Sequence, residues 1–206
     1  MHIPYYSDLF ENDKNLSNKY FSLSKEICKK LKINEHIKYI DRGVYGFSFR
    51  VGKNNVFKFT KDQSEVAVAL RNTFNNKNII NIFDVIKINT NLIDDENLYL
   101  IIENYIEKIP ENKKEYIVCL IEQIYKNKLT NVDRFLSKNL SIDNKYLSDL
   151  KNIYYECKKL KIKNLDLHID NLGFNSNEEL VLFDLGNFEN EKISKNVKMI
   201  KIDFLN

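Results

Sequence analysis

The chain has 206 residues, enough for one large domain or two small lobes, and 43% of them are hydrophobic, which argues against a disordered chain. Basic residues (32 Lys and Arg) and acidic residues (29 Asp and Glu) nearly cancel to a net charge of +3, so the composition does not indicate nucleic-acid binding. Three widely spaced cysteines, without a Cys-x-x-Cys pair, argue against a disulfide framework or a zinc site. With neither a signal-peptide pattern nor a membrane-length apolar run, we expect a soluble cytoplasmic protein.

The first predicted element is an amphipathic helix near the N-terminus. Apolar residues recur there every three or four positions and so share one helix face: Leu16, Tyr20, Leu23, Ile27 and Leu31. From residue 37 the pattern changes to short segments rich in β-branched and aromatic residues, separated by turns that contain Gly or Asn. These segments predict three antiparallel strands, over residues 37–40, 45–51 and 56–59.

A helix is predicted to interrupt the strands. Residues 62–74 carry apolar residues at helical spacing, and either Asp62 or Ser64 would cap the helix N-terminus. Residues 79–88 and 98–103 then return to strand character. The first half therefore has the predicted order β-β-β-α-β-β.

The second half is predicted to be mainly helical. After Pro110, apolar residues at helical spacing indicate two helices, around residues 117–125 and 147–160. A stretch rich in Asp, His and Asn follows at residues 164–171. Two short apolar segments, separated by an Asn-Ser-Asn turn, then predict a β-hairpin that ends at Asp184.

Two motifs that flank this hairpin carry the functional prediction. Asp166 precedes Asn171 by five residues in the run Asn-Leu-Asp-Leu-His-Ile-Asp-Asn, and Asp184 begins an Asp-Leu-Gly motif. Each motif alone also fits a solvated turn, but their order and spacing resemble the protein kinase and aminoglycoside-phosphotransferase superfamily. The resemblance covers roughly residues 37–188 and implies a phosphotransferase that uses ATP and Mg²⁺.

The resemblance implies a role for each of these residues. Phosphoryl transfer needs cations to neutralise the triphosphate, and Mg²⁺ prefers oxygen ligands. Asn171 and Asp184 would be the metal ligands, and Asp166 would be the catalytic base that accepts or orients the proton of the acceptor hydroxyl. His168 occupies a position at which it would contact the transferred phosphate or brace the loop by a structural hydrogen bond.

A loop in the first half resembles the glycine-rich loop that covers the nucleotide phosphates. Gly43 and Gly46 stand at its second and third glycine places, and Tyr45 would cap the loop tip. Asp41 replaces the first glycine. An ordinary hairpin is the alternative interpretation of the same residues.

Three further segments complete the resemblance. Lys58 matches the strand lysine that contacts the α- and β-phosphates, and Glu65 on the following helix would form an ion pair with it. Taken alone, Lys58 also fits an edge-strand lysine that faces water, and Glu65 fits an acid favoured by the helix dipole. Glu103 and Tyr105 lie in a segment that resembles the adenine-binding hinge.

Together these patterns predict an α+β, protein-kinase-like bilobal fold. It would have an N-terminal helical extension (1–36), an N-lobe with a five-stranded antiparallel sheet and one helix (37–108), and a truncated, mainly helical C-lobe (109–206). Only a short tail follows Asp184, without an Ala-Pro-Glu signature. We therefore expect a homodimer or another partner to complete the short C-lobe.

The predicted function is that of a small protein kinase that uses ATP and Mg²⁺ to phosphorylate Ser or Thr hydroxyls. The expected partners are ATP and a protein substrate, with no nucleic acid and no membrane. Two alternatives stay open: a small-molecule kinase of the aminoglycoside or sugar type, and a non-catalytic, pseudokinase-like binding module.

Overall fold

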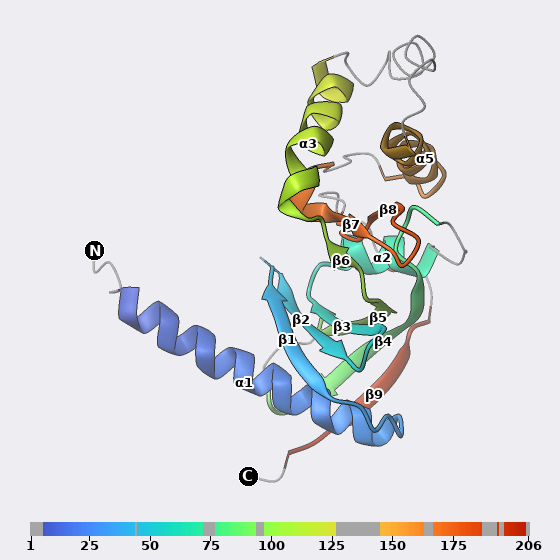
Figure 1. The fold of residues 1–206 in the computed structure, drawn as a ribbon. Helices are drawn as coiled ribbons and strands as arrows, with labels where there is room; N and C mark the ends of the chain where they lie inside the picture. Colours follow the sequence, from blue (N-terminus) through green and yellow to red (C-terminus); the bar gives the residue numbers. More distant parts are fainter. Residues whose placement is uncertain are drawn as a thin grey trace, which may run out of the picture. The chain divides into compact units, whose positions relative to one another are not determined.

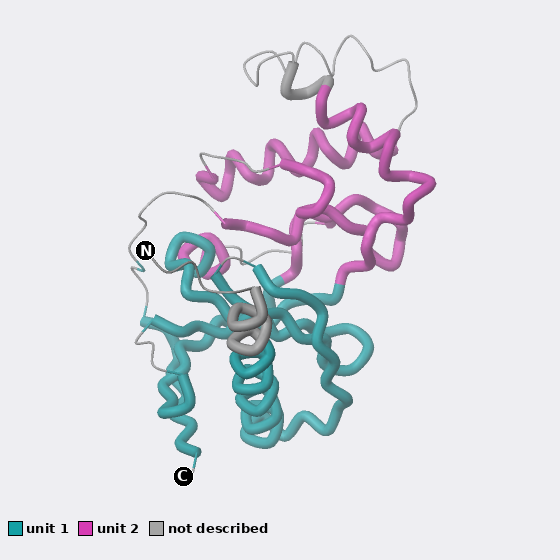
Figure 2. The backbone as a smooth tube through the Cα atoms, turned by 90° about the vertical axis from the view of Figure 1, so that its left-hand side faces the viewer, with its two compact units in different colours: residues 1–66, 82–105, 193–206 teal, residues 67–81, 106–192 magenta. Residues whose placement is uncertain are grey.

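The computed structural model describes residues 6–43, 45–71, 77–93, 97–126, 145–162, 167–186, 193 and 196–204 (Figure 1). These residues form an α+β protein, as predicted, with four α-helices and two sheets in the described part of the chain. The chain divides into two compact units (Figure 2). Unit 1 comprises residues 1–66, 82–105 and 193–206, and unit 2 comprises residues 67–81 and 106–192.

Unit 1 is built on a six-stranded sheet. Its strands are β1 (Ile37–Arg42), β2 (Gly46–Val51), β3 (Asn55–Thr60), β4 (Ile82–Thr90), β5 (Tyr99–Asn104) and β9 (Lys198–Ile202). The strand order is β1-β2-β3-β5-β4-β9, and all neighbouring pairs are antiparallel except β4 and β9. β3 and β5 are therefore interior strands, whereas β1 and β9 form the edges.

This sheet corrects the prediction of five antiparallel strands. The additional strand, β9, comes from residues that were expected in the C-lobe, and it pairs parallel to β4 from Ile86–Lys198 to Thr90–Ile202. The segment Lys-Met-Ile-Lys-Ile is short and carries two charges, so its own pattern is weak. Its partner lies more than a hundred residues earlier in the chain, where no turn signal points to it.

Helix α1 (Tyr6–Lys30) supplies part of the core of unit 1. Figure 1 shows its C-terminal half crossing the sheet. The predicted apolar face is confirmed, because Tyr20, Leu23 and Ile27 are fully buried in one cluster with side chains from the sheet. The Tyr20 ring stacks on that of Phe47 with centroids 4.5 Å apart. Residues 1–36, expected to form an extension, thus include part of the core of this unit.

Strand periodicity explains why the sheet presents one apolar face to α1. In β2, Phe47, Phe49 and Val51 are buried and alternate with half-buried residues. Successive side chains of a strand point to opposite faces, so these three share a face. Removing such a buried aromatic side chain typically costs about 3–5 kcal/mol, which makes this layer a principal source of stability.

Unit 2 contains the hairpin predicted near Asp184. Its elements are β6 (Glu107–Lys108), α3 (Glu111–Lys126), α5 (Lys145–Lys159), the 3₁₀ helix η2 (Ile169–Asn171), β7 (Leu172–Phe174) and β8 (Leu180–Leu182). β6, β7 and β8 form an antiparallel sheet in that order. Helix α2 (Gln63–Arg71) begins in unit 1, and its residues from Ala67 onward belong to unit 2.

The helices of unit 2 bury the faces that the sequence predicts. Ile117, Leu120 and Ile121 of α3 are buried, and α5 buries residues at the same helical spacing: Leu147, Leu150, Ile153 and Cys157. Within the described part of the chain, none of the helices combines the length and apolar character needed to cross a bilayer.

Candidate functional site

Lys58 lies in the interior of the sheet of unit 1. It is on β3, with Ser48 of β2 on one side and Ile101 of β5 on the other. Its side chain is only 18% exposed and forms an ion pair with Glu65, whose side chain is 7% exposed. The predicted ion pair is thus present, and the alternative of an edge-strand lysine that faces water does not hold.

The start of α2 explains why Glu65 reaches Lys58. The Asp62 carboxylate accepts hydrogen bonds from the Ser64 N–H (2.8 Å) and the Glu65 N–H (3.4 Å), so Asp62 is the N-cap residue. This cap fixes the first turn of α2 directly after β3 and places Glu65 in that turn. The Glu65 carboxylate is therefore stabilised both by the positive end of the helix dipole and by the Lys58 ammonium.

The predicted glycine-rich loop joins β1 and β2. The Gly43 N–H donates to the Gly46 carbonyl oxygen at 3.0 Å, and Tyr45 is 52% exposed. A Cβ on Gly46 would lie 1.7 Å from the Phe59 carbonyl oxygen, whereas a Cβ on Gly43 would meet open space. Strand pairing alone therefore requires a glycine at position 46. At position 43, packing does not require a glycine.

The segment expected to bind adenine is occupied by internal contacts. Glu103 is buried within β5, where it pairs with Val56 and Ile82. The Tyr105 N–H donates to the Asn54 carbonyl oxygen at 2.7 Å, and the Arg50 guanidinium lies 3.7 Å from the centroid of the Tyr105 ring. In this conformation the Tyr105 N–H is therefore already hydrogen-bonded within unit 1.

Asn171 and Asp184 flank the open end of the β7–β8 hairpin in unit 2. The hairpin register pairs Leu172 with Leu182, and the Phe183 N–H donates to the Asn171 carbonyl oxygen at 3.1 Å. Asp184 is the next residue, so the pairing of β7 with β8 places the two predicted metal ligands at the same end of the hairpin. Asn171 is buried, and the Asp184 carboxylate accepts the Gly186 N–H at 3.2 Å.

The remaining residues of the predicted catalytic loop divide into two cases. Asp166, the predicted base, lies outside the described residues. His168 is half exposed, and its Nδ1 accepts the Asp170 N–H at 3.2 Å, which caps η2. This hydrogen bond is consistent with the loop-bracing interpretation of His168, and the Asp170 carboxylate, with 85% side-chain exposure, lies 3.8 Å from His168 Nδ1.

Two buried polar residues that hold the β7–β8 hairpin were not predicted from the sequence. Asn78 and Asp149 are almost fully buried, and both bind the backbone of Leu180 in β8. The Asn78 amide donates to the Leu180 carbonyl at 2.7 Å, and the Asp149 carboxylate accepts the Leu180 N–H at 3.0 Å. Asp149 lies between Leu147 and Leu150, and a charge on an apolar helix face is a signal that could have identified it.

The oxygen atoms of Asn171 and Asp184 could hold Mg²⁺ only together with phosphate oxygens. Among the described residues there is no group of three or more His, Cys, Asp and Glu side chains that would hold a metal. Mg²⁺ commonly uses one or two carboxylates and completes its shell with water and substrate phosphates. The Asp184 carboxylate and the Asn171 amide oxygen would match that partial set.

No protein-family model matches the chain, and no curated protein matches it either. The functional interpretation therefore depends on the residues and their geometry.

Proposed function

We propose that this protein is an ATP- and Mg²⁺-dependent phosphotransferase, and that it acts as a small protein kinase on Ser or Thr hydroxyls. The observation that carries the proposal is the Lys58–Glu65 ion pair on an interior strand. An ion pair with so little solvent costs desolvation energy and is a weak source of stability. Its best explanation is that Glu65 aims the Lys58 ammonium at the α- and β-phosphates.

The hairpin in unit 2 supplies the second part of the proposal. Asn171 and Asp184 offer two oxygen donors at the end of one hairpin, and Asp166 would orient the acceptor hydroxyl. The metal would neutralise charge on the β- and γ-phosphates when it is bound.

Nucleotide binding is the first test. Thermal unfolding of the wild-type chain would be followed with ATP, with and without Mg²⁺, beside Asp184→Ala and the matched control Asp203→Ala. Asp203 is an exposed acid of the C-terminal segment, where its side chain is 56% exposed. We expect ATP and Mg²⁺ to raise the Tm of the wild type and of Asp203→Ala but not of Asp184→Ala. Equal Tm values with and without nucleotide in all three would refute the proposal.

The acceptor is the second test. The chain would be incubated with γ-labelled ATP and either a protein mixture or a mixture of sugars and aminoglycosides. Label on protein Ser or Thr is expected, and its loss in Asp166→Ala with ATP binding retained would assign the base. Label only in small molecules would favour the aminoglycoside or sugar-kinase alternative. Nucleotide binding without any transfer would identify a non-catalytic binding module.

A further inference from the structure

A pocket of about 750 Å³ lies within unit 2, and none of the residues discussed above as ligands of ATP or Mg²⁺ lines it. One wall is the segment Lys77–Asn78, which precedes β4. The other wall is the C-terminal half of α5, with Asn152, Tyr155, Glu156, Lys158 and Lys159. Pockets that hold small organic ligands usually measure about 300–1,000 Å³, so this pocket has a suitable size.

The residues that line the pocket include more lysines than acids. Its lining contains three lysines and one glutamate. Lys159 forms an ion pair with Glu156 one turn earlier on α5. Lys158 is exposed, with its ammonium 5.5 Å from the centroid of the Tyr154 ring, and no carboxylate of the described residues lies within ion-pair distance of it. Lys158 therefore brings a positive charge that the described lining does not neutralise.

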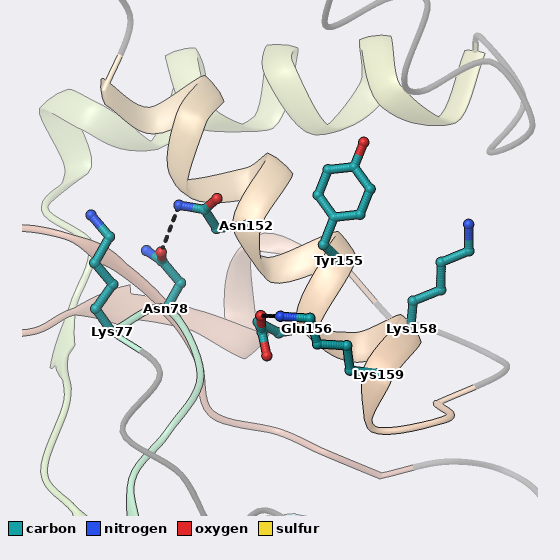
Figure 3. A pocket seen from close by; sticks show the side chains of 7 residues that line it. All are labelled: Lys77, Asn78, Asn152, Tyr155, Glu156, Lys158 and Lys159. Carbon is teal, nitrogen blue, oxygen red and sulfur yellow. Dashed lines mark hydrogen bonds and ion pairs between the residues drawn. The ribbon is translucent and has the colours of Figure 1, made fainter.

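Lys77 brings a second ammonium from the opposite wall. It binds Glu179 at 3.0 Å and lies 4.0 Å from Asp149, and the hydrogen bond to Glu179 is the main cause that raises the pKa of Lys77. The two carboxylates hold the ammonium in place and balance its charge, so the unbalanced positive charge of the pocket comes from Lys158. Figure 3 shows the Lys77 and Lys158 side chains on opposite sides of the view, with Asn152 and Tyr155 between them.

The middle of the pocket is polar and anchored. The Asn152 amide donates to the Asn78 side-chain oxygen at 3.2 Å, and Asn78 is in turn fixed to β8 through Leu180 (Figure 3). One amide N–H of Asn152 and its carbonyl oxygen are not used by that bond. Tyr155 adds an aromatic ring. The arrangement offers the Lys158 ammonium, and an amide and a ring for an organic group.

From this charge and chemistry we propose that the pocket is a binding site for a small phosphate ester. Lysine ammonium groups bind phosphate as point charges, and a phosphate monoester is mostly dianionic at pH 7, which complements the lysine-rich lining. The organic part of the ester would lie against Tyr155 and Asn152. None of the pocket residues belongs to the proposed ATP and Mg²⁺ site. The pocket proposal is therefore independent of the proposed phosphotransferase activity.

A titration with ribose 5-phosphate in EDTA, followed by calorimetry, tests the proposal without ATP or Mg²⁺. The wild type would be compared with Lys158→Gln and with the matched control Lys114→Gln, which changes a partly exposed lysine of α3 that is paired with Glu111. Both variants lose one positive charge, so a general electrostatic effect would weaken them equally. We expect a loss of affinity of about three- to tenfold in Lys158→Gln and none in Lys114→Gln, since one charge-assisted contact is removed.

Four outcomes would overturn the proposal. The first is the absence of saturable binding at about 10 mM ester, and the second is an equal affinity of the wild type and Lys158→Gln for the ester. The third is that ribose without its phosphate binds as well as ribose 5-phosphate. The fourth is that a hexaglutamate peptide binds more tightly than ribose 5-phosphate. Inorganic phosphate provides the remaining comparison. Weaker binding of inorganic phosphate than of the ester supports a role for the organic group, and equal binding contradicts it.

Discussion

At the scale of single residues, the charge of Lys58 is tolerated inside an interior strand because Glu65 is held opposite to it. The two side chains come from β3 and from the first turn of α2, and the Asp62 cap determines where that turn begins. Each charge depends on the other, since an unpaired charge with so little solvent is costly.

A double-mutant cycle measures this dependence. Glu65→Gln should lower the free energy of unfolding by about 1–3 kcal/mol, because the Lys58 ammonium loses its ion pair with Glu65. Lys58→Met should also destabilise the protein, because the Glu65 carboxylate loses the same ion pair. Urea denaturation of the double variant should show a coupling of about 0.5–3 kcal/mol. Strictly additive losses would mean that the two charges are solvated independently.

The two loop glycines should respond in opposite ways to the same change. Gly46→Ala would force a Cβ against the Phe59 carbonyl oxygen, so we expect a loss of about 3 kcal/mol or more in thermal or urea unfolding. Gly43→Ala has open space and should change stability by less than about 0.5 kcal/mol. Weaker ATP binding by a stable Gly43→Ala would then point to a backbone contact with phosphate. Equal stability of both variants would contradict the packing argument.

At the scale of elements, local patterns were sufficient where the partner of a segment lies nearby in the chain. The buried face of α1, strands β2 and β3 and the β7–β8 hairpin follow from spacing and turn residues, which also narrowed the cap of α2 to Asp62 or Ser64. β9 could not be predicted in this way, because a parallel partner carries no turn signal. The bonds of Asn78 and Asp149 to Leu180 likewise join distant segments, and neither residue belongs to a motif.

Strand β9 should nevertheless contribute measurably to unit 1. Ile202 is 2% exposed and belongs to the core cluster with α1, whereas Met199 on the same strand is 61% exposed. We expect Ile202→Ala to lower the free energy of unfolding by about 2–4 kcal/mol and Met199→Ala to change it by less than about 0.5 kcal/mol. Denaturant unfolding of both variants makes the comparison, and similar losses would show that β9 is not packed as described.

At the scale of the whole molecule, the two units are not consecutive in sequence. Unit 2 takes residues 67–81 from the middle of unit 1, and this segment supplies Asn78 and the parallel bridge between Ile79 and Leu182. The candidate residues are divided in the same way, with Lys58 in unit 1 and Asp184 in unit 2. The predicted lobes, 37–108 and 109–206, also separate Lys58 from Asp184, but they do not assign residues 67–81 to the unit of Asp184 or residues 193–206 to the unit of Lys58.

Fragments of the chain test the division. A fragment of residues 106–192 lacks the segment that bonds to both ends of β8, so we expect it to give poorly dispersed NMR spectra. A fragment of residues 67–192 restores that segment and should fold more cooperatively, as judged by NMR dispersion and thermal unfolding. If the shorter fragment folds equally well, residues 67–81 are not part of the unit.

The parallel pairing of β9 with β4 also has a consequence during synthesis. A ribosome releases the chain from its N-terminus, so β1 to β5 emerge before most of unit 2, and β9 emerges after it. Until residues 198–202 leave the exit tunnel, the outer side of β4 has no strand beside it, and unpaired strand edges favour aggregation. The nascent chain would therefore be most exposed to misassembly, and most dependent on chaperones, while unit 2 is being translated.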